Sequence, residues 1–406
     1  MQSRRAVTTG QIRAAAVHEF ATVGPRALSM QGIAKRAYIS IGAVYERWPN
    51  SEACILDLVT NELPDRVTAI TQPWIDVHGD TTGLVESDLA DPARLADLRF
   101  IMECAFAARD DERLRTVVAT EIRRLGATIA SRLGLADIDP ETGWWMASTW
   151  LGHALLVTSG CPIPATFVPE LAIVMSRLPE VQQSQHDTAR PETPSDFLAP
   201  DPTPPLAQDT TGDALVQAAA DVILTHGVNE ADTRRIAQEA GVSTGAIYRR
   251  YAGRGEVLDD VLRAELTPER YAWVQDFIAA VAQPDGLTAG ARYLAGLIAR
   301  NWQDERSATL LLEITVAAHT DPQVLAGVMR EITKVADSRT ALLEQFVDIG
   351  LIRDDVSAST LAWLFQISPV GMRILASIGM VPTQEALTRL MEAYLHFLLA
   401  DGTQPE

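Results

Sequence analysis

The sequence predicts an all-α protein built from two copies of one unit. Apolar residues recur at spacings of three and four in Ala-rich stretches, and no alternating β-type run lies between hairpin turns. Residues 33–48 and 236–251 share eight of sixteen positions without a gap, at an offset of 203, where random pairing gives about one. A Pro-rich segment, residues 180–212, separates the copies and predicts an extended or disordered linker.

Length and composition exclude a single ordinary domain and favour two packed domains of roughly 200 residues each. The chain has 406 residues, of which 47% are hydrophobic, and a domain holds roughly 150 residues. The N-terminus lacks the apolar segment of a secretory signal, and no apolar run is long enough to span a membrane. The three cysteines show neither metal-binding nor disulfide spacing. We therefore expect a soluble, cytoplasmic protein with no membrane association.

The charge of the chain is unevenly distributed. The net charge is −19, yet residues 30–51 carry +2 and residues 233–254 carry +4, which leaves −25 on the remainder. An acidic body cannot hold nucleic acid along its whole surface, so any DNA contact is expected at these two basic windows and should weaken with salt.

Each copy is expected to begin with a long helix, over residues 12–20 in the first copy and 215–223 in the second. A glycine then stands where a helix C-cap is favoured, and a side chain suited to an N-cap precedes the next helix. In the two copies these residues are Gly24 and Gly227, then Ser29 and Asp232.

A helix-turn-helix motif follows in each copy. Short helices are predicted at residues 30–37 and 233–240, and after a turn of three or four residues a second helix starts at Ser40 or Ser243. In such a motif the second helix enters the major groove of DNA. The serine caps this reading helix, and the following Gly and Ala keep its leading face slim. We call the domains that hold these motifs the first head and the second head.

The second motif resembles a known family. Residues 240–258, AGVSTGAIYRRYAGRGEVL, are similar to the A-G-V-S-x-G-x-[LI]-Y signature of the TetR family of one-component repressors. The resemblance implies two tandem TetR-like units, each with a three-helix DNA-binding domain followed by a helical ligand-binding and dimerisation domain. In that family the last two helices pair two subunits, and a small-molecule effector releases the double-stranded DNA operator.

The motif positions also imply which residues contact DNA. In the first head they are Ser29, Gln31, Ser40, Ile41, Gly42, Ala43, Tyr45 and Arg47. In the second head they are Thr233, Arg234, Ser243, Thr244, Gly245, Ala246, Tyr248, Arg250 and Arg254.

The first head departs from the family pattern. The turn between its two short helices, where a positive φ is commonly needed, holds a tyrosine in place of glycine. The cation that binds phosphate is also missing. The four differences are Tyr38 for Gly241, Ser51 for Arg254, Gln31 for Arg234 and Ile41 for Thr244. We expect the first head to bind more weakly and to read a different sequence, and packing without any DNA role remains an alternative for it.

The remaining residues are assigned to two regulatory bodies. The expected domains are residues 1–62, 63–179, 213–265 and 266–406, with the linker at 180–212. Helices near 141–159 and 166–178 correspond to those near 356–377 and 384–400, which favours an intramolecular pseudo-dimer and an operator with unlike half-sites. The apolar stripe of the last helix could instead face its own core, and further homo-dimerisation stays open.

An effector site is expected among aromatic and polar residues of the bodies, although such residues belong to a core more often. The candidates are Met102, Phe106, Trp145, His153, Trp302, Glu313, Trp363 and Gln366. Their number and type favour a largely apolar effector.

The predicted function is a sequence-specific DNA-binding transcriptional regulator, expected to be a repressor, and activation in place of repression stays open. The sequence holds no phosphate-binding Gly loop, no nucleophile elbow and no metal-binding motif, so we expect neither enzyme activity nor a catalytic residue, cofactor or metal. The alternative is a small-molecule-binding or interaction protein of the same fold that has lost DNA binding in one or both heads.

Overall fold

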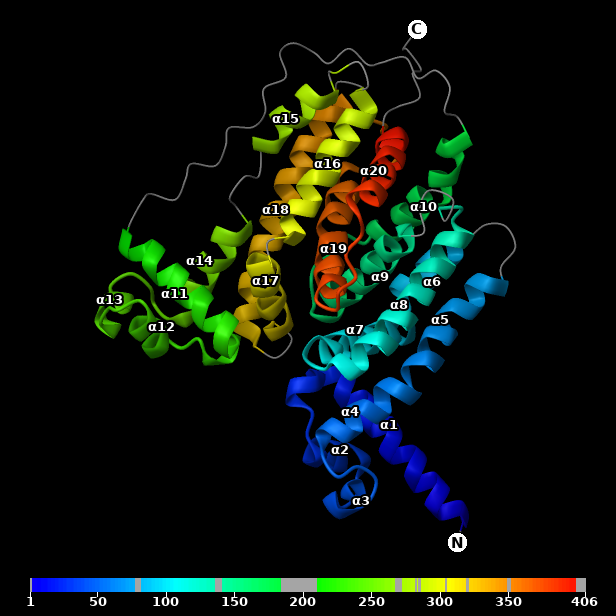
Figure 1. Ribbon diagram of the computed structural model, residues 1–406, viewed down its shortest axis with the longest axis vertical. Coiled ribbons are helices and arrows are strands. Elements are labelled where there is room, and N and C mark those ends of the chain that lie inside the picture. The colour runs from blue at the N-terminus through cyan, green and yellow to red at the C-terminus, as the bar shows by residue number, and fades with distance from the viewer. Residues whose placement is uncertain are drawn as a thin grey trace. The chain divides into compact units, whose positions relative to one another are not determined.

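The computed structural model describes residues 2–76, 82–135, 141–183, 210–266, 272–281, 283, 286–303, 305–318, 321–348 and 352–398. Within these ranges the chain forms α-helices and one short 3-10 helix, and no β-strand (Figure 1). The expectation of an all-α protein is confirmed. None of the described helices is long and apolar enough to cross a membrane.

The helices form two compact units. Unit 1 comprises residues 1–158 and 367–381, and unit 2 comprises residues 159–366 and 382–406. One division falls inside helix α19 (Ala358–Ala376). Each compact unit therefore contains helices from both sequence copies.

Unit 1 begins with the first head. Its helices are α1 (Gln2–Ala27), α2 (Met30–Ala37), α3 (Ile41–Tyr45) and α4 (Ser51–Asn61). The helix α1 is kinked at Gly24, where φ is 75°, and Pro25 follows. Phe20, Ile33 and Val44 are completely buried, so one apolar core joins α1, α2 and α3.

The first body completes unit 1 together with residues 367–381 of the C-terminal region. Its helices are α5 (Leu63–Asp76), α6 (Thr82–Ala90), α7 (Pro92–Asp110), α8 (Glu112–Arg132) and α9 (Thr142–Thr158). The helices α8 and α9 meet backbone to backbone, because a Cβ atom on Gly126 would lie 1.8 Å from the carbonyl oxygen of Gly143. Only glycine permits this approach.

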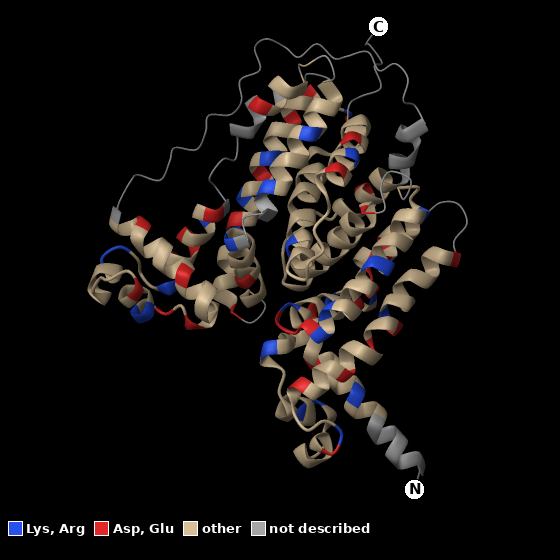
Figure 2. Cartoon of the chain, in the orientation of Figure 1, with Lys and Arg blue, Asp and Glu red and all other residues tan. Residues whose placement is uncertain are grey.

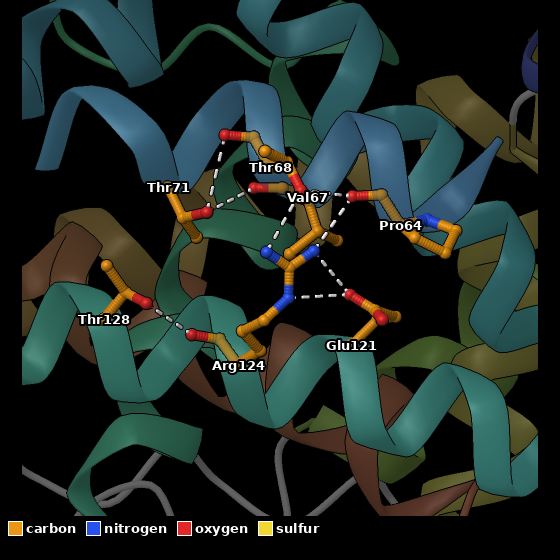
Figure 3. A network of polar contacts seen from close by, with 7 residues as sticks. All are labelled: Pro64, Val67, Thr68, Thr71, Glu121, Arg124 and Thr128. Atoms are coloured by element: carbon orange, nitrogen blue, oxygen red, sulfur yellow. Dashed lines mark hydrogen bonds and ion pairs between the residues drawn. The ribbon is translucent and has the colours of Figure 1, made fainter. Parts of the chain in front are cut away.

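A polar network ties α8 to the start of α5 (Figure 3). The Arg124 guanidinium donates to the Pro64 carbonyl oxygen at 2.9 Å and to Thr68 Oγ1 at 3.1 Å. Glu121, one turn earlier on α8, accepts from the same guanidinium at 2.6 Å. Since α5 directly follows the first head, this network fixes the part of the body closest to it in sequence.

A second buried network lies deeper in the first body. Asp88 on α6 is 1% exposed and accepts from the indole nitrogens of Trp74, at 2.7 Å, and Trp150, at 3.1 Å. The two indole rings pack edge to face with centroids 6.0 Å apart. Burial raises the pKa of Asp88, and the two indole hydrogen bonds oppose this by favouring the carboxylate.

Unit 2 contains the second head and most of the second body. The head consists of α11 (Thr210–His226), a 3-10 turn (Val228–Glu230), α12 (Thr233–Glu239), α13 (Thr244–Tyr248) and α14 (Arg254–Leu266). Helices α10 (Phe167–Gln183), α15 (Ala272–Val281), α16 (Gly286–Gln303), α17 (Glu305–Ala317), α18 (Pro322–Asp348), the first part of α19 and α20 (Gln384–Leu398) form the rest. As in the first head, the long first helix packs against the short one that follows it, and α11 also packs against α14.

The expected linker is shorter than predicted at both ends. The helix α10 continues to Gln183 and α11 starts at Thr210, so residues 180–183 and 210–212 are helical. Residues 184–209 of the linker lie outside the described part of the chain. The last helices of each copy, α9, α10, α19 and α20, occur within five residues of the expected bounds.

Candidate DNA-binding heads

The first head has the local geometry of a helix-turn-helix. Ser29 caps α2 by accepting from the Gly32 backbone nitrogen at 3.0 Å, and Ser40 caps α3 by accepting from Ala43 at 3.4 Å. Residues 38–40 form the turn between them. Both predicted N-caps are confirmed.

The second head repeats this geometry with one change. Asp232 caps α12 by accepting from the Arg235 backbone nitrogen at 2.8 Å. Ser243 occupies the N-cap position of α13 with extended backbone angles, but its side chain makes no capping hydrogen bond. The expectation that this serine caps the reading helix through its side chain is therefore wrong. The residue is exposed at the start of that helix.

The turn between the two short helices adopts a left-handed conformation in both heads. Gly241 has φ 67°, and Tyr38, its counterpart, has φ 56° and ψ 43°. Among the described residues Tyr38 alone combines a side chain with a positive φ. Left-handed backbone costs an L-residue on the order of 1 kcal/mol. The tyrosine is 96% exposed, so contacts within its own chain do not offset this cost.

The reading helices are held by one buried residue and one aromatic hydrogen bond each. Val44 and Ile247 are completely buried. The indole nitrogen of Trp48 donates to Asp57 at 2.9 Å. In the second head, a tyrosine takes the same role: the hydroxyl of Tyr251 donates to Asp260 at 2.9 Å. These repeated bonds fix the end of α3 to α4 and the end of α13 to α14.

Most of the residues expected to contact DNA are exposed. In the first head Ser29, Gln31, Ser40, Ile41, Gly42 and Tyr45 are exposed, and Ala43 and Arg47 are partly buried. In the second head Arg234, Ser243, Thr244, Gly245, Tyr248 and Arg250 are exposed, and Thr233, Ala246 and Arg254 are partly buried. The hydroxyls of Thr233 and Tyr248 lie 3.1 Å apart and link the start of α12 to the end of α13. Met30 stands opposite Thr233, so the first head cannot form this bond.

Several cations of the heads engage groups of their own chain. The Arg47 guanidinium lies 4.9 Å from the centroid of the Trp48 ring and 3.9 Å from Asp57. Arg36 forms an ion pair with Glu19 at 2.8 Å. Figure 2 shows acidic residues along many of the described helices, with Lys and Arg interspersed among them.

Arg254 has a partner that sequence reasoning missed. Its guanidinium donates to Asp321 Oδ2 at 3.1 Å and to the Val228 carbonyl oxygen at 2.7 Å. Asp321 precedes α18 and also accepts from the backbone nitrogens of Gln323 and Val324. The Asp-Pro sequence at 321–322 could have indicated this N-cap, but not the arginine that meets it.

The first copy has a related junction with the charges exchanged. Asp111, which directly precedes α8 as Asp321 precedes α18, accepts from Arg113 at 2.6 Å, and Arg113 also donates to Glu52 on α4 at 2.6 Å. The head thus contributes the acid in the first copy and the arginine in the second. The first junction joins the first head to α8 of its body, and the second joins the second head to the start of α18.

The candidate effector residues are buried. Met102, Phe106, Trp145, His153, Glu313, Trp363 and Gln366 are all less than a tenth exposed, and the side chain of Trp302 lies outside the described part of the structure. His153 Nε2 lies 2.9 Å from the Leu89 carbonyl oxygen, and burial lowers the pKa of the imidazole to about 4. Gln366 accepts from Arg339 at 2.9 Å.

In a comparison with known protein families, one family model matches both heads. The family model described as bacterial regulatory proteins, tetR family, matches residues 12–58 and again residues 215–261. Each match begins in the first helix of a head and ends in the helix that follows the reading helix. A search of curated proteins found no match.

Proposed function

Because the chain belongs to the tetR family of bacterial regulatory proteins and carries two TetR-like units in tandem, we propose that this DNA-binding regulator is a repressor with an asymmetric operator. One head of the chain contacts each half-site. A small molecule bound in one or both bodies releases the DNA. The observation that carries the proposal is the presence of two family domains with unlike reading surfaces in one polypeptide.

The unlike surfaces are what favour unlike half-sites. Ile41 and Gln31 are exposed in the first head where Thr244 and Arg234 are exposed in the second. Ile41 has no group that can hydrogen-bond to a base edge, whereas Thr244 has a hydroxyl. The two side chains therefore select different base edges. A pair of identical heads favours a palindrome, whereas this pair favours two different half-sites.

Contacts between the two copies support pairing within one chain. In unit 1, Thr149 Oγ1 on α9 lies 2.8 Å from Ser368 Oγ on α19. A Cβ atom on Gly371 would lie 1.7 Å from the Ser148 carbonyl oxygen, so the two helices touch through their backbones. In unit 2, Glu170 on α10 accepts from the Ser357 backbone nitrogen, just before α19, at 2.8 Å. A side chain of the first copy therefore supports the start of a helix of the second.

The bodies have the composition of an effector domain. Buried polar side chains such as His153 and Gln366 lie among large apolar ones, the combination that small-molecule sites use. The proposal keeps the expected division of the chain, with heads at residues 1–62 and 213–265 and bodies at residues 63–179 and 266–406. It assigns the release of DNA to a change in the spacing of the heads.

Selection of genomic fragments bound by the full chain, followed by sequencing and footprinting, tests the proposal. We expect one site class with two unlike half-sites about one helical turn apart. A perfect palindrome would contradict the pairing of unlike heads. Recovery of no fragment at low salt would favour the alternative, a protein of this fold without DNA binding.

A further inference from the structure

Exposed apolar side chains gather on the turn and the reading helix of the first head. Seven large hydrophobic residues are exposed in the described part of the chain, and three of them, Tyr38, Ile41 and Tyr45, fall within eight residues. Ile41 is 44% exposed, while Val44, on the same helix, is completely buried in the core. The fold therefore uses Val44 for packing and leaves Ile41 outside.

The second head has no such cluster. Gly241 and Thr244 replace Tyr38 and Ile41, and Tyr248 is the single exposed large hydrophobic residue described in that head. Exposed apolar side chains that lie close together mark a binding surface more often than those scattered singly. Here the cluster lies within the region that matches the family model, on the helix that faces DNA in a helix-turn-helix.

We infer that Ile41 reads thymine methyl groups in the half-site of the first head. The C5-methyl group of thymine is the apolar feature of base pairs in the major groove, and the other groups there are hydrogen-bond donors or acceptors. An isoleucine side chain can bury this methyl group but can satisfy no donor or acceptor. A Cβ atom added to Gly42, the next residue, would meet only the hydroxyl of Ser40, at 3.9 Å, so the space beside Ile41 is open to a base.

This inference rests on the proposed function and assigns it a chemical basis. The first head lacks the cation of Arg254, since Ser51 occupies that position. Phosphate contacts carry affinity but no sequence information, so apolar contact has a larger share in the binding free energy of this head. In the second head Thr244 carries a hydroxyl at the same position and can read a donor or an acceptor.

Replacement of thymine by deoxyuridine tests the inference because it removes the methyl group alone. The probe is the DNA fragment recovered by selection with the full chain, with deoxyuridine placed in one half-site at a time. For one half-site we expect binding to weaken about fourfold per contacted methyl group, the factor that corresponds to roughly 0.8 kcal/mol. I41A should remove this sensitivity, and the matched variant T244A should keep it.

The outcomes separate the inference from the function it rests on. If the fragment binds and neither half-site responds to deoxyuridine, or if I41A responds as strongly as the unchanged protein, Ile41 does not read a methyl group and the inference is overturned. If no fragment is recovered at all, the proposed function fails first. Because Ile41 is exposed, I41A should keep the helix content and melting temperature of the unchanged chain, which circular dichroism checks.

Discussion

At the scale of single residues, Tyr38 shows how the first head differs from the second. Its backbone holds a left-handed conformation that glycine adopts at no steric cost, and its side chain is almost fully exposed. Strained backbone of this kind concentrates at functional sites. The position of Tyr38 beside the reading helix fits that rule, since glycine would satisfy the turn better.

Replacing Tyr38 by glycine should therefore stabilise the first head. We expect Y38G to raise the local free energy of opening by about 0.5–1 kcal/mol, because relief of left-handed strain exceeds the entropy cost of glycine. Amide hydrogen exchange of residues 30–45, read by mass spectrometry, measures this change. The reciprocal variant G241Y should speed exchange in the second head. Faster exchange in Y38G would mean that the tyrosine makes a stabilising contact.

Glu103 provides a second residue-scale prediction, on pH. It is 2% exposed, pairs with Arg99 at 2.9 Å, and burial raises its pKa from the ordinary 4.5 to about 7. An acid with a raised pKa binds its proton more tightly in the folded protein, so its stabilising effect is present below pH 4.5 and is lost as pH rises through 7.

The unfolding free energy of unit 1 should thus fall between pH 4.5 and 7 relative to E103Q, which cannot titrate. The glutamine keeps an acceptor for Arg99. Urea denaturation of both proteins at several pH values measures the difference. Parallel pH profiles for the two proteins would show that the carboxyl of Glu103 does not titrate in this range.

At the scale of helices, the two junctions between a head and its body differ in which side contributes the arginine of the ion pair. In the second copy Asp321 engages Arg254, the residue expected to bind phosphate. In the first copy the head contributes Glu52, and Arg113 lies on the body. A body can therefore compete with DNA for this cation of the second head, whereas in the Glu52–Arg113 pair the cation belongs to the body.

Removing the charge of Asp321 should strengthen DNA binding. D321N keeps Oδ1, the oxygen that caps α18. It puts an amide nitrogen in place of Oδ2, the oxygen that pairs with Arg254. We expect higher operator affinity at low salt and a salt dependence steeper by about 0.9 in slope, as for one added phosphate contact. Titration by fluorescence anisotropy at several salt concentrations measures both. The matched control E52Q breaks the first junction and should leave the slope unchanged. An unchanged slope in D321N would show that Asp321 does not compete with phosphate.

Helices and caps could be predicted from the sequence because they depend on nearby residues. Ser29, Asp232 and Ser40 each stand three positions before the backbone nitrogen they bind. The Arg254–Asp321 pair spans 67 positions and depends on how α14 meets α18, which no local pattern records. The burial of Glu103 was equally hidden, because a charged residue on a helix is more often exposed.

At the scale of the whole molecule, the tandem arrangement links two heads that need not stay alike. In a symmetric dimer one substitution changes both half-site preferences, whereas here Ile41 and Thr244 can change separately. Such divergence is useful only if unlike halves remain paired. The hydrogen bond that Ser357 donates to Glu170 joins unlike residues of the two copies. The backbone contacts of α9 with α19 are instead reciprocal, with Gly371 against Ser148 and Gly152 against Ile367.

Pairing of the copies should fix the distance between the heads, and the spacing of half-sites tests this. An insertion of about 5 base pairs turns one half-site to the opposite face of DNA, so the unchanged chain should lose about a hundredfold in affinity as binding through both heads ends. G371A places a Cβ atom 1.7 Å from the Ser148 carbonyl oxygen and should separate α9 from α19. Its affinity for the original site should be lower and its loss on insertion smaller.

Two further variants make the spacing test decisive. G152A, on the facing helix, places a Cβ atom 2.3 Å from the Ile367 carbonyl oxygen and should behave as G371A does. G83A adds the same methyl group where no atom lies within 4 Å and should behave as the unchanged chain. Electrophoretic mobility shift with the original and the lengthened site measures all four proteins. If G371A and G152A lose as much on insertion as the unchanged chain, the contact of α9 with α19 does not set the distance between the heads.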